Sequence, residues 1–345
     1  MTNWLRHKLF SGWASALATL HIVVLVGWVL PGIVQWSVTQ AVFVADAGLC
    51  RALDGTGACW GVIAEKWRLI LFGRYPHAEQ WRPALTTALI VILLIYSALA
   101  RQRITRLTRV WGVMLPSGLL LMAGGAFGLT AVETSLWGGL PLTLLLSLAA
   151  IAGALPCGIL LALGRRSTLP ALRALCSVYI ELVRGLPLIP VLFMAAFLFP
   201  LFLPPGLGAG VLLRVLLALI LFAAAHLAEV VRGGLQTVPQ GQYDTARALG
   251  LNAWQVQRHV ILPQALRAAL PTLTNSFIAI LKDVSLVTVV SLYELTGSLS
   301  LALAGDADWR PYFLEGYLFI GIIYWVGCFT LSRYSQRLEA RLSLG

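Results

Sequence analysis

Charged side chains are scarce in this chain. Only 11% of its 345 residues are Asp, Glu, Lys or Arg, whereas a soluble domain carries about 25%. Hydrophobic residues make up 59%. Because so few ionised groups cannot cover a globular surface in water, the sequence predicts an integral membrane protein that lies in a lipid bilayer. The formal net charge of +11 then reports on orientation in the membrane, and we expect no nucleic acid as a partner.

Lysine occurs only at Lys8, Lys66 and Lys282. None of them is followed by Ser or Thr, so the G-x-x-x-x-G-K-[ST] loop that binds the phosphates of ATP is excluded. The H-E-x-x-H, C-x-x-C and G-x-S-x-G patterns of metal sites and nucleophiles are absent as well. We therefore expect no catalytic residue, no metal site and no cofactor bound by this chain, and we do not expect an enzyme.

Long segments with almost no charge alternate with charged connections. A helix needs about 20 mainly apolar residues to cross the hydrocarbon core of a bilayer, and these segments predict an all-α, polytopic membrane protein with about eight spans. The first apolar run is too long for the core of a cleavable signal peptide, so we expect it to be retained. The predicted spans lie at residues 17–34, 83–100, 110–132, 134–164, 174–203, 211–228, 268–292 and 316–332.

The positive charges predict an orientation, because Lys and Arg that flank spans favour the cytoplasm. Eight spans put both termini on one side. With both termini in the cytoplasm, 17 Lys and Arg fall inside and 6 outside. Five of those six lie in one long outer loop, at about 36–82, where charge counts have less weight. The six outer residues are Arg51, Lys66, Arg68, Arg74, Arg82 and Arg310.

Two of the five cysteines, Cys50 and Cys59, fall in the predicted outer loop. A disulfide persists outside the cytoplasm, and the intervening Asp54, Gly55 and Gly57 allow the chain to turn back. We predict that the two cysteines are bonded, with a pair of free thiols as the alternative.

The connection between the sixth and seventh predicted spans has strong turn signals. Pro239 ends the preceding helix, a short helix follows at 242–249, and Gly250 allows a tight turn. Asn252 is suited to cap a second short helix that reaches Val260, and Pro263 starts the next span. Such a helix–turn–helix is suited to dock in a groove of a partner protein, and an ordinary amphipathic loop is the alternative. Its expected apolar face comprises Ala246, Leu249, Leu251, Trp254 and Val260.

This segment resembles the coupling motif of ABC importer membrane subunits, E-A-A-x3-G-x9-I-x-L-P. Asp replaces Glu, Thr replaces the first Ala and Val replaces Ile, whereas the Gly, Leu and Pro match at full spacing. The motif falls on Asp244, Thr245, Ala246, Gly250, Val260, Leu262 and Pro263. In the family, this element inserts into the ATP-hydrolysing subunit and transmits its closure to the membrane helices.

Three further stretches, 181–188, 228–234 and 281–286, resemble the polar amino-acid permeases of the histidine/glutamine type. The likeness covers about 134–341, and the three-span extension before it resembles the general L-amino-acid transport system. The resemblance implies an extension at 1–133 with its long periplasmic loop, followed by an ABC importer transmembrane domain of five helices at 134–345. The coupling element would occupy 240–263.

The resemblance also implies function and partners. The chain would be the permease subunit of an ATP-driven importer of L-amino acids in a bacterial inner membrane, and would form half of the pore. Its partners would be two ATPase subunits that hold ATP and Mg, a related but different permease subunit and a periplasmic binding protein. An ion-coupled secondary transporter is the first alternative, and a membrane enzyme or assembly factor is the second.

Charged residues near or within spans are further candidates, because charge at membrane depth usually faces a bundle interior or an aqueous cavity. A helix brings together residues three apart, so two such pairs are expected either to anchor the boundary or to share in gating. Lys282 and Asp283, with Ser285 beside them, are candidates for the substrate path, and a structural ion pair is the alternative. The two pairs are Glu181 with Arg184 and Glu229 with Arg232.

Overall fold

The computed structural model describes residues 9, 11–99, 104–202, 204 and 209–342, and within them all extended regular structure is helical. The chain forms two compact units. The first comprises Met1–Trp67 and Leu303–Phe319, and the second comprises Arg68–Ala302 and Ile320–Gly345. The all-α fold predicted from the sequence is therefore confirmed.

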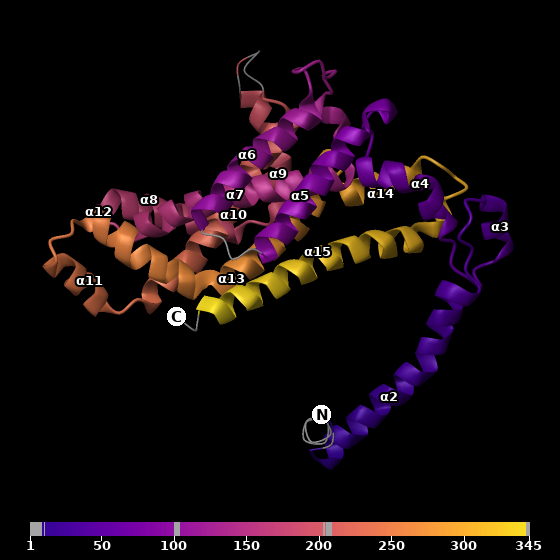
Figure 1. Cartoon of the computed structure of the whole chain (residues 1–345), viewed down its shortest axis with the longest axis horizontal. Coiled ribbons are helices and arrows are strands. Elements are labelled where there is room, and N and C mark those ends of the chain that lie inside the picture. Colours follow the sequence, from indigo (N-terminus) through magenta and orange to yellow (C-terminus); the bar gives the residue numbers. More distant parts are fainter. Residues whose placement is uncertain (1–8, 10, 100–103, 203, 205–208, 343–345) are drawn as a thin grey trace. The chain divides into compact units, whose positions relative to one another are not determined.

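The first unit contains α2 (Trp13–Val34), which continues into a π-helical turn at Gln35–Thr39. α2 is a long helix (Figure 1) in which no residue is buried, although nearly all of its side chains are apolar. Trp13–Thr39 is long and apolar enough to cross a membrane. Lipid is the solvent that suits such a helix, as the sequence predicts for its first span.

The rest of the first unit is cross-linked. Cys50, in α3 (Ala47–Ala52), forms a disulfide with Cys59, with their Cα atoms 5.5 Å apart. The Cys59 amide donates to Glu315 Oε1 at 2.9 Å. Lys66 Nζ donates to Asp306 Oδ2 at 2.7 Å, and this hydrogen bond lowers the pKa of the Asp306 carboxyl. The hydrogen bond to Glu315 and the ion pair to Asp306 bring sequence-distant segments into one unit, and the disulfide cross-links the first of them.

The disulfide should be protected and stabilising. Closing a loop of this length contributes about 2–3 kcal/mol through the entropy of the unfolded chain, so Cys50→Ser with Cys59→Ser should lower the thermal stability measurably. Alkylation followed by mass spectrometry checks the bond. The native protein should carry no label at either cysteine until it is reduced, and full labelling of both before reduction would contradict the assignment.

The second unit is built around α7 (Gly139–Arg165), α10 (Val211–Thr237) and α13 (Leu262–Asp283), with α10 packed against both others. The α7–α10 contact is close, because a Cβ added at Gly158 would lie 2.9 Å from the Leu227 Cβ. Small residues let helix backbones approach in this way inside membranes.

A broken helix lies beside this core. α8 (Pro170–Gly185) and α9 (Leu188–Phe193), which continues through short π and 3-10 turns to Phe202, meet at an angle of 108°. The sequence predicts a single span at 174–203, and its charged residues Glu181 and Arg184 both lie within α8. The break comes at Leu186-Pro187, where proline has no N–H to donate and restricts the residue before it.

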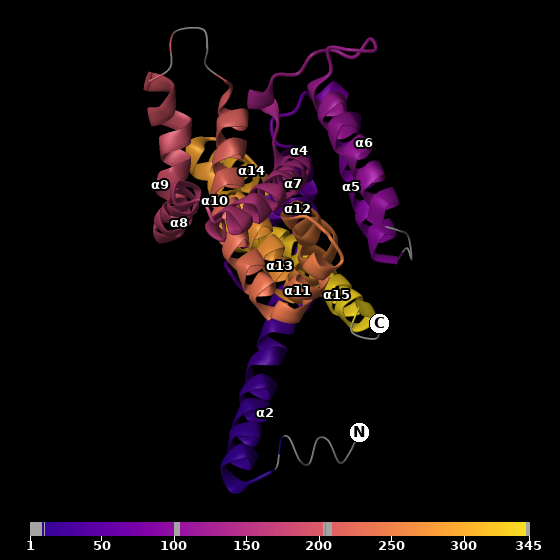
Figure 2. The ribbon, with the colours of Figure 1, turned by 90° about the vertical axis from the view of Figure 1, so that its left-hand side faces the viewer.

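α5 (Trp81–Leu99) and α6 (Ile104–Ala123) run side by side (Figure 2). The third span was predicted at 110–132, but α6 ends earlier because Gly124 and Gly125 take positive φ angles of 65° and 76°. The remaining helices are α4 (Gly61–Phe72), α14 (Leu295–Ala304) and α15 (Phe313–Leu342).

Each of the eight predicted spans coincides at least in part with a helix, but not every helix meets a test of length and hydropathy. Among the described residues, six helices are long and apolar enough to cross a membrane, or seven if the bent pair α8–α9 counts as one. α6 accounts for the difference, because Arg106 and Arg109 in its first two turns lower its hydropathy. The seven agree with a polytopic membrane protein.

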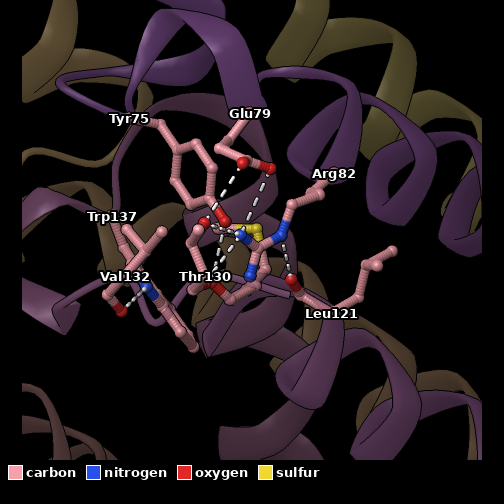
Figure 3. A network of polar contacts seen from close by, with 8 residues as sticks. Tyr75, Glu79, Arg82, Leu121, Thr130, Val132 and Trp137 are labelled. Carbon is pink, nitrogen blue, oxygen red and sulfur yellow. Dashed lines mark hydrogen bonds and ion pairs between the residues drawn. The ribbon is translucent and has the colours of Figure 1, made fainter. Parts of the chain in front are cut away.

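Arg82, near the start of α5, is fully buried and holds the end of α6 and the following loop (Figure 3). Its Nε donates to the Leu121 carbonyl at 2.8 Å, and its Nη1 donates to the Thr130 carbonyl at 3.0 Å. Glu79 pairs with the same guanidinium at 3.4 Å. Tyr75 donates to the Met122 carbonyl, and burial raises the pKa of the Tyr75 phenol.

Glu294 forms a second buried network at the start of α14. Its carboxylate accepts hydrogen bonds from Thr143 Oγ1 in α7 at 3.2 Å and from the Tyr324 hydroxyl in α15 at 2.8 Å. The amides of Thr296 and Gly297 donate to its other oxygen at 2.9 and 3.0 Å. A carboxylate suits this place because the amide groups at a helix N-terminus carry partial positive charge.

Candidate functional site

The predicted helix–turn–helix is present between α10 and α13. α11 (Gln240–Ala248) starts directly after Pro239, and the turn that follows it contains Gly250 with φ +80°. No atom lies within 4 Å of a Cβ built at Gly250. The backbone conformation alone therefore favours glycine at this position.

The second helix begins with the predicted cap. Asn252 Oδ1 accepts from the Gln255 amide, and Gln255 Oε1 accepts from the Asn252 amide, both at 2.9 Å. The pair forms a capping box that fixes the start of α12 (Ala253–Gln255). A π-helical turn (Val256–Ile261) follows and runs into α13, which has Pro263 in its first turn. The second helix and the next span are thus continuous.

The apolar residues of this element do not form one face, contrary to the expectation from sequence. Ala246 is buried, and Leu251 and Val260 pack against the core of the second unit. Leu249 and Trp254 remain 77% and 60% exposed. The exposed pair, Leu249 and Trp254, flanks the turn at Gly250, where α11 ends and α12 begins. The other apolar residues lie on the side of the element that packs against the spans.

The remaining motif residues also divide into exposed and partly buried ones. Asp244 and Thr245 are exposed on α11, and Asp244 Oδ1 accepts from Gln240 Nε2 at 3.4 Å. Leu262 is half-buried and Pro263 is exposed at the start of α13. The element therefore has a buried inner side and an outer surface that combines a carboxylate with two large apolar side chains.

Five charged residues form a cluster about two turns from the α11 end of α10. Glu229 and Arg232 pair as their spacing indicates, with Arg232 Nε donating to Glu229 Oε1 at 2.9 Å. Glu181 and Arg184 do not pair with each other, contrary to the prediction. Arg165, at the end of α7, reaches Glu181 at 2.7 Å and Glu229 at 3.4 Å, and Arg184 lies 3.8 Å from Glu229.

Glu181 pairs with Arg165 and not with Arg184 because α7 packs against α8. This packing places a partner for Glu181 on the neighbouring helix. The cluster joins three helices through charge. Beside it, a groove of about 440 Å³ between α10 and α13 is lined in part by Glu229, Arg232, Thr237 and Thr272.

Lys282 and Asp283 are the last residues of α13, and Ser285 lies in the 3-10 turn that follows (Val284–Val290). Lys282 is exposed, whereas Asp283 and Ser285 are half-buried. No ion pair within 4.0 Å joins Lys282 to Asp283 in the described part of the chain. Their place in a substrate path stays a prediction. No group of three metal-binding side chains occurs within the same residues.

Comparison with known proteins places the chain in a family. Residues 154–344 match the family described as binding-protein-dependent transport system inner membrane component. The chain is 44% identical to the inner membrane amino-acid ABC transporter permease protein YhdY of Escherichia coli (strain K12), with 99% of this chain and 93% of that protein covered. It is 34% identical to the glutamate/glutamine/aspartate/asparagine transport system permease protein BztC of Rhodobacter capsulatus, with the same coverage.

A solved structure agrees with these relatives. The structure of an amino acid ABC transporter with histidines superposes with a TM-score of 0.52 at 32% identity, and covers 59% of this chain and 92% of that one. The family match, the relatives along the whole chain and the shared helical core lead to one conclusion. The chain belongs to the binding-protein-dependent transport system inner membrane components, among the amino-acid permeases of ABC importers.

Proposed function

We propose that this chain forms half of the translocation pore of an ATP-driven importer of L-amino acids and couples that pore to ATPase subunits. The family membership supports an ABC importer over an ion-coupled secondary transporter. The observation that carries the coupling role is the helix–turn–helix of α11 and α12. It is packed against the spans on its inner side and presents Leu249 and Trp254 on its outer side.

Exposed apolar side chains on helices that are packed against the rest of the protein can bind in a hydrophobic groove of a partner protein. We propose that two ATPase subunits dock at 240–263 and hold the ATP and Mg, so that hydrolysis takes place on those subunits. A related but different permease subunit would complete the pore, and a periplasmic binding protein would deliver the amino acid. Both termini would lie in the cytoplasm, because that orientation places most Lys and Arg on the inner side.

The division of the chain is part of the proposal. Residues 1–133 would form the extension with its periplasmic loop, and 134–345 would form the transmembrane domain of the importer. The charged cluster would then lie near the cytoplasmic end of the pore, and Lys282, Asp283 and Ser285 would lie along the substrate path. The cluster comprises Arg165, Glu181, Arg184, Glu229 and Arg232.

Gly250→Val tests the coupling role. A β-branched residue at φ +80° costs about 1–2 kcal/mol of backbone strain, and it should displace the exposed Leu249 and Trp254 from their docking positions. We expect uptake of a radiolabelled mixture of L-amino acids into vesicles that contain the transporter purified from its native membrane to fall by about tenfold. Co-purification of ATPase subunits should fall with it.

The matched control is Gly112→Val in α6, outside the coupling element, where the glycine has an ordinary φ and open space around it. This variant should transport as well as the unmodified chain. Equal uptake and equal ATPase co-purification for the two valine variants would refute the coupling role of the turn. Absence of any ATPase subunit from the unmodified preparation would refute the proposed function itself.

A further inference from the structure

Arg166, the residue that caps the end of α7, makes contacts with two other elements. Its Nη1 donates to the Leu235 carbonyl near the end of α10 and to the Tyr243 hydroxyl in α11, each at 3.2 Å. The guanidinium carbon lies 5.8 Å from the centre of the Tyr243 ring, within the range of a cation–π interaction. One side chain therefore joins α7, α10 and α11.

The Leu235 contact has a chemical cause. In a helix, a carbonyl accepts from the amide four residues later, and for Leu235 that residue is Pro239, which has no N–H. The carbonyl is thus left without its helical donor at the point where α10 ends. Arg166 supplies that donor from another helix, so the proline that separates α11 from α10 also creates the acceptor for Arg166.

The Tyr243 contact fixes the position of α11. Tyr243 is only 7% exposed, although α11 is a polar helix with most other side chains in solvent. Its ring packs in the core of the second unit and its hydroxyl accepts from Arg166. Tyr243 is therefore the residue through which α11 is held to the end of α7.

We propose that Arg166 is a positioning residue that transmits displacement of the coupling element directly to α7. The chain itself connects α11 to α10 and connects α12 to α13, but α7 has no such covalent connection. The hydrogen bond from Arg166 to Tyr243 provides a noncovalent connection instead, so that three helices of the core respond to one docked partner. This inference rests on the proposed docking of ATPase subunits at the same element.

The neighbouring Arg165 does not share this role. Its guanidinium pairs with Glu181 and Glu229 in the charged cluster, whereas Arg166 contacts the coupling element. The two consecutive arginines thus bind different partners at the end of α7. Substitution of Arg166 therefore leaves the ion pairs of Arg165 in place.

The number of amino acids imported per ATP hydrolysed, measured in vesicles with the purified native complex, distinguishes a transmission role from a general structural one. Arg166→Gln removes hydrogen bonds from a charged donor, and we expect the import ratio to fall about tenfold. Association with the ATPase should stay unchanged, because Leu249 and Trp254 are not altered. Tyr243→Phe keeps the buried ring and loses only the hydroxyl, so it should cause a smaller loss in the same ratio.

Arg166→Lys should recover part of the ratio, since an ammonium group keeps the charge but lacks the planar fork that contacts two acceptors. Arg173→Gln, an exposed arginine of α8, serves as the matched control and should leave the ratio unchanged. An unchanged ratio in both Arg166→Gln and Tyr243→Phe would overturn the inference while leaving the proposed function intact. Equal losses of ATPase association and transport would overturn it too, because they would indicate a merely structural role.

Discussion

Glu294→Ala should destabilise the second unit by about 4 kcal/mol or more, because it removes four hydrogen bonds at once and only Thr143 has another acceptor among the described residues, the Gly139 carbonyl. The hydroxyls of Thr143 and Tyr324 and two amides of α14 all bond to this one carboxylate. A buried donor left without a partner costs about 1–3 kcal/mol. Thermal unfolding of the detergent-solubilised protein should show a large fall in the transition temperature and a loss of the monodisperse peak on size exclusion.

Two control variants define the cause. Glu294→Gln keeps the shape and one acceptor oxygen, so it should retain a substantial part of the stability. Glu65→Ala changes an exposed glutamate in the same way and should have an effect within about 0.5 kcal/mol. If Glu294→Ala unfolds at the same temperature as Glu65→Ala, the carboxylate does not hold α7, α14 and α15 together.

Arg82→Met should have an effect of similar size, about 3–5 kcal/mol, because it removes one partner from a buried charged network. Methionine fills much of the volume, but the carbonyls of Leu121 and Thr130 lose their donor and Glu79 loses its counter-charge. Thermal unfolding reports the total loss. Amide hydrogen exchange should increase most at residues 124–132, where Arg82 holds the loop.

Arg51→Met is the matched control for this substitution. Arg51 pairs with Asp308 at 3.5 Å, but both side chains are more than half exposed, and a surface ion pair contributes about 0–1 kcal/mol. The stability loss of Arg82→Lys should lie between those of Arg82→Met and Arg51→Met, because lysine keeps the charge but lacks the planar set of donors of the guanidinium. Exchange at 124–132 that is identical in Arg82→Met and Arg51→Met would show that the loop is held by other contacts.

The helix–turn–helix at 240–263 could be predicted from sequence because its signals are local. Proline, a glycine that permits positive φ and an asparagine cap each act within a few residues, and Pro239, Gly250 and Asn252 occupy the expected positions in the structure. The positions of most spans are local in the same sense, since they depend on the hydropathy of about 20 consecutive residues.

The two buried networks could not be predicted because their partners are distant in sequence. Glu294 bonds to Thr143, 151 residues away, and the sequence near Glu294 indicates only a connection after a span. α14, with 10 residues, is too short to be recognised as a span. The sequence indicates Arg82 only as one of the outer charges, although the residue is fully buried.

Ion pairs between different helices could not be predicted from sequence for the same reason. The spacing of Glu181 and Arg184 favours a pair on one helix, and only the packing of α7 against α8 shows that Arg165 takes Glu181 instead. The bend between α8 and α9 falls inside the single span predicted at 174–203, and the proline chemistry at Pro187 decides its position.

The continuity of the π-helical turn with α13 has a mechanical consequence. From Ala253 to Val290 the chain is one helical segment of 38 residues, which is about 57 Å long at 1.5 Å per residue. The hydrocarbon core of a bilayer is only about 30 Å thick. The segment is therefore longer than the hydrocarbon core, and it connects Trp254 in the helix–turn–helix to residues beyond Asp283 through one run of helical backbone.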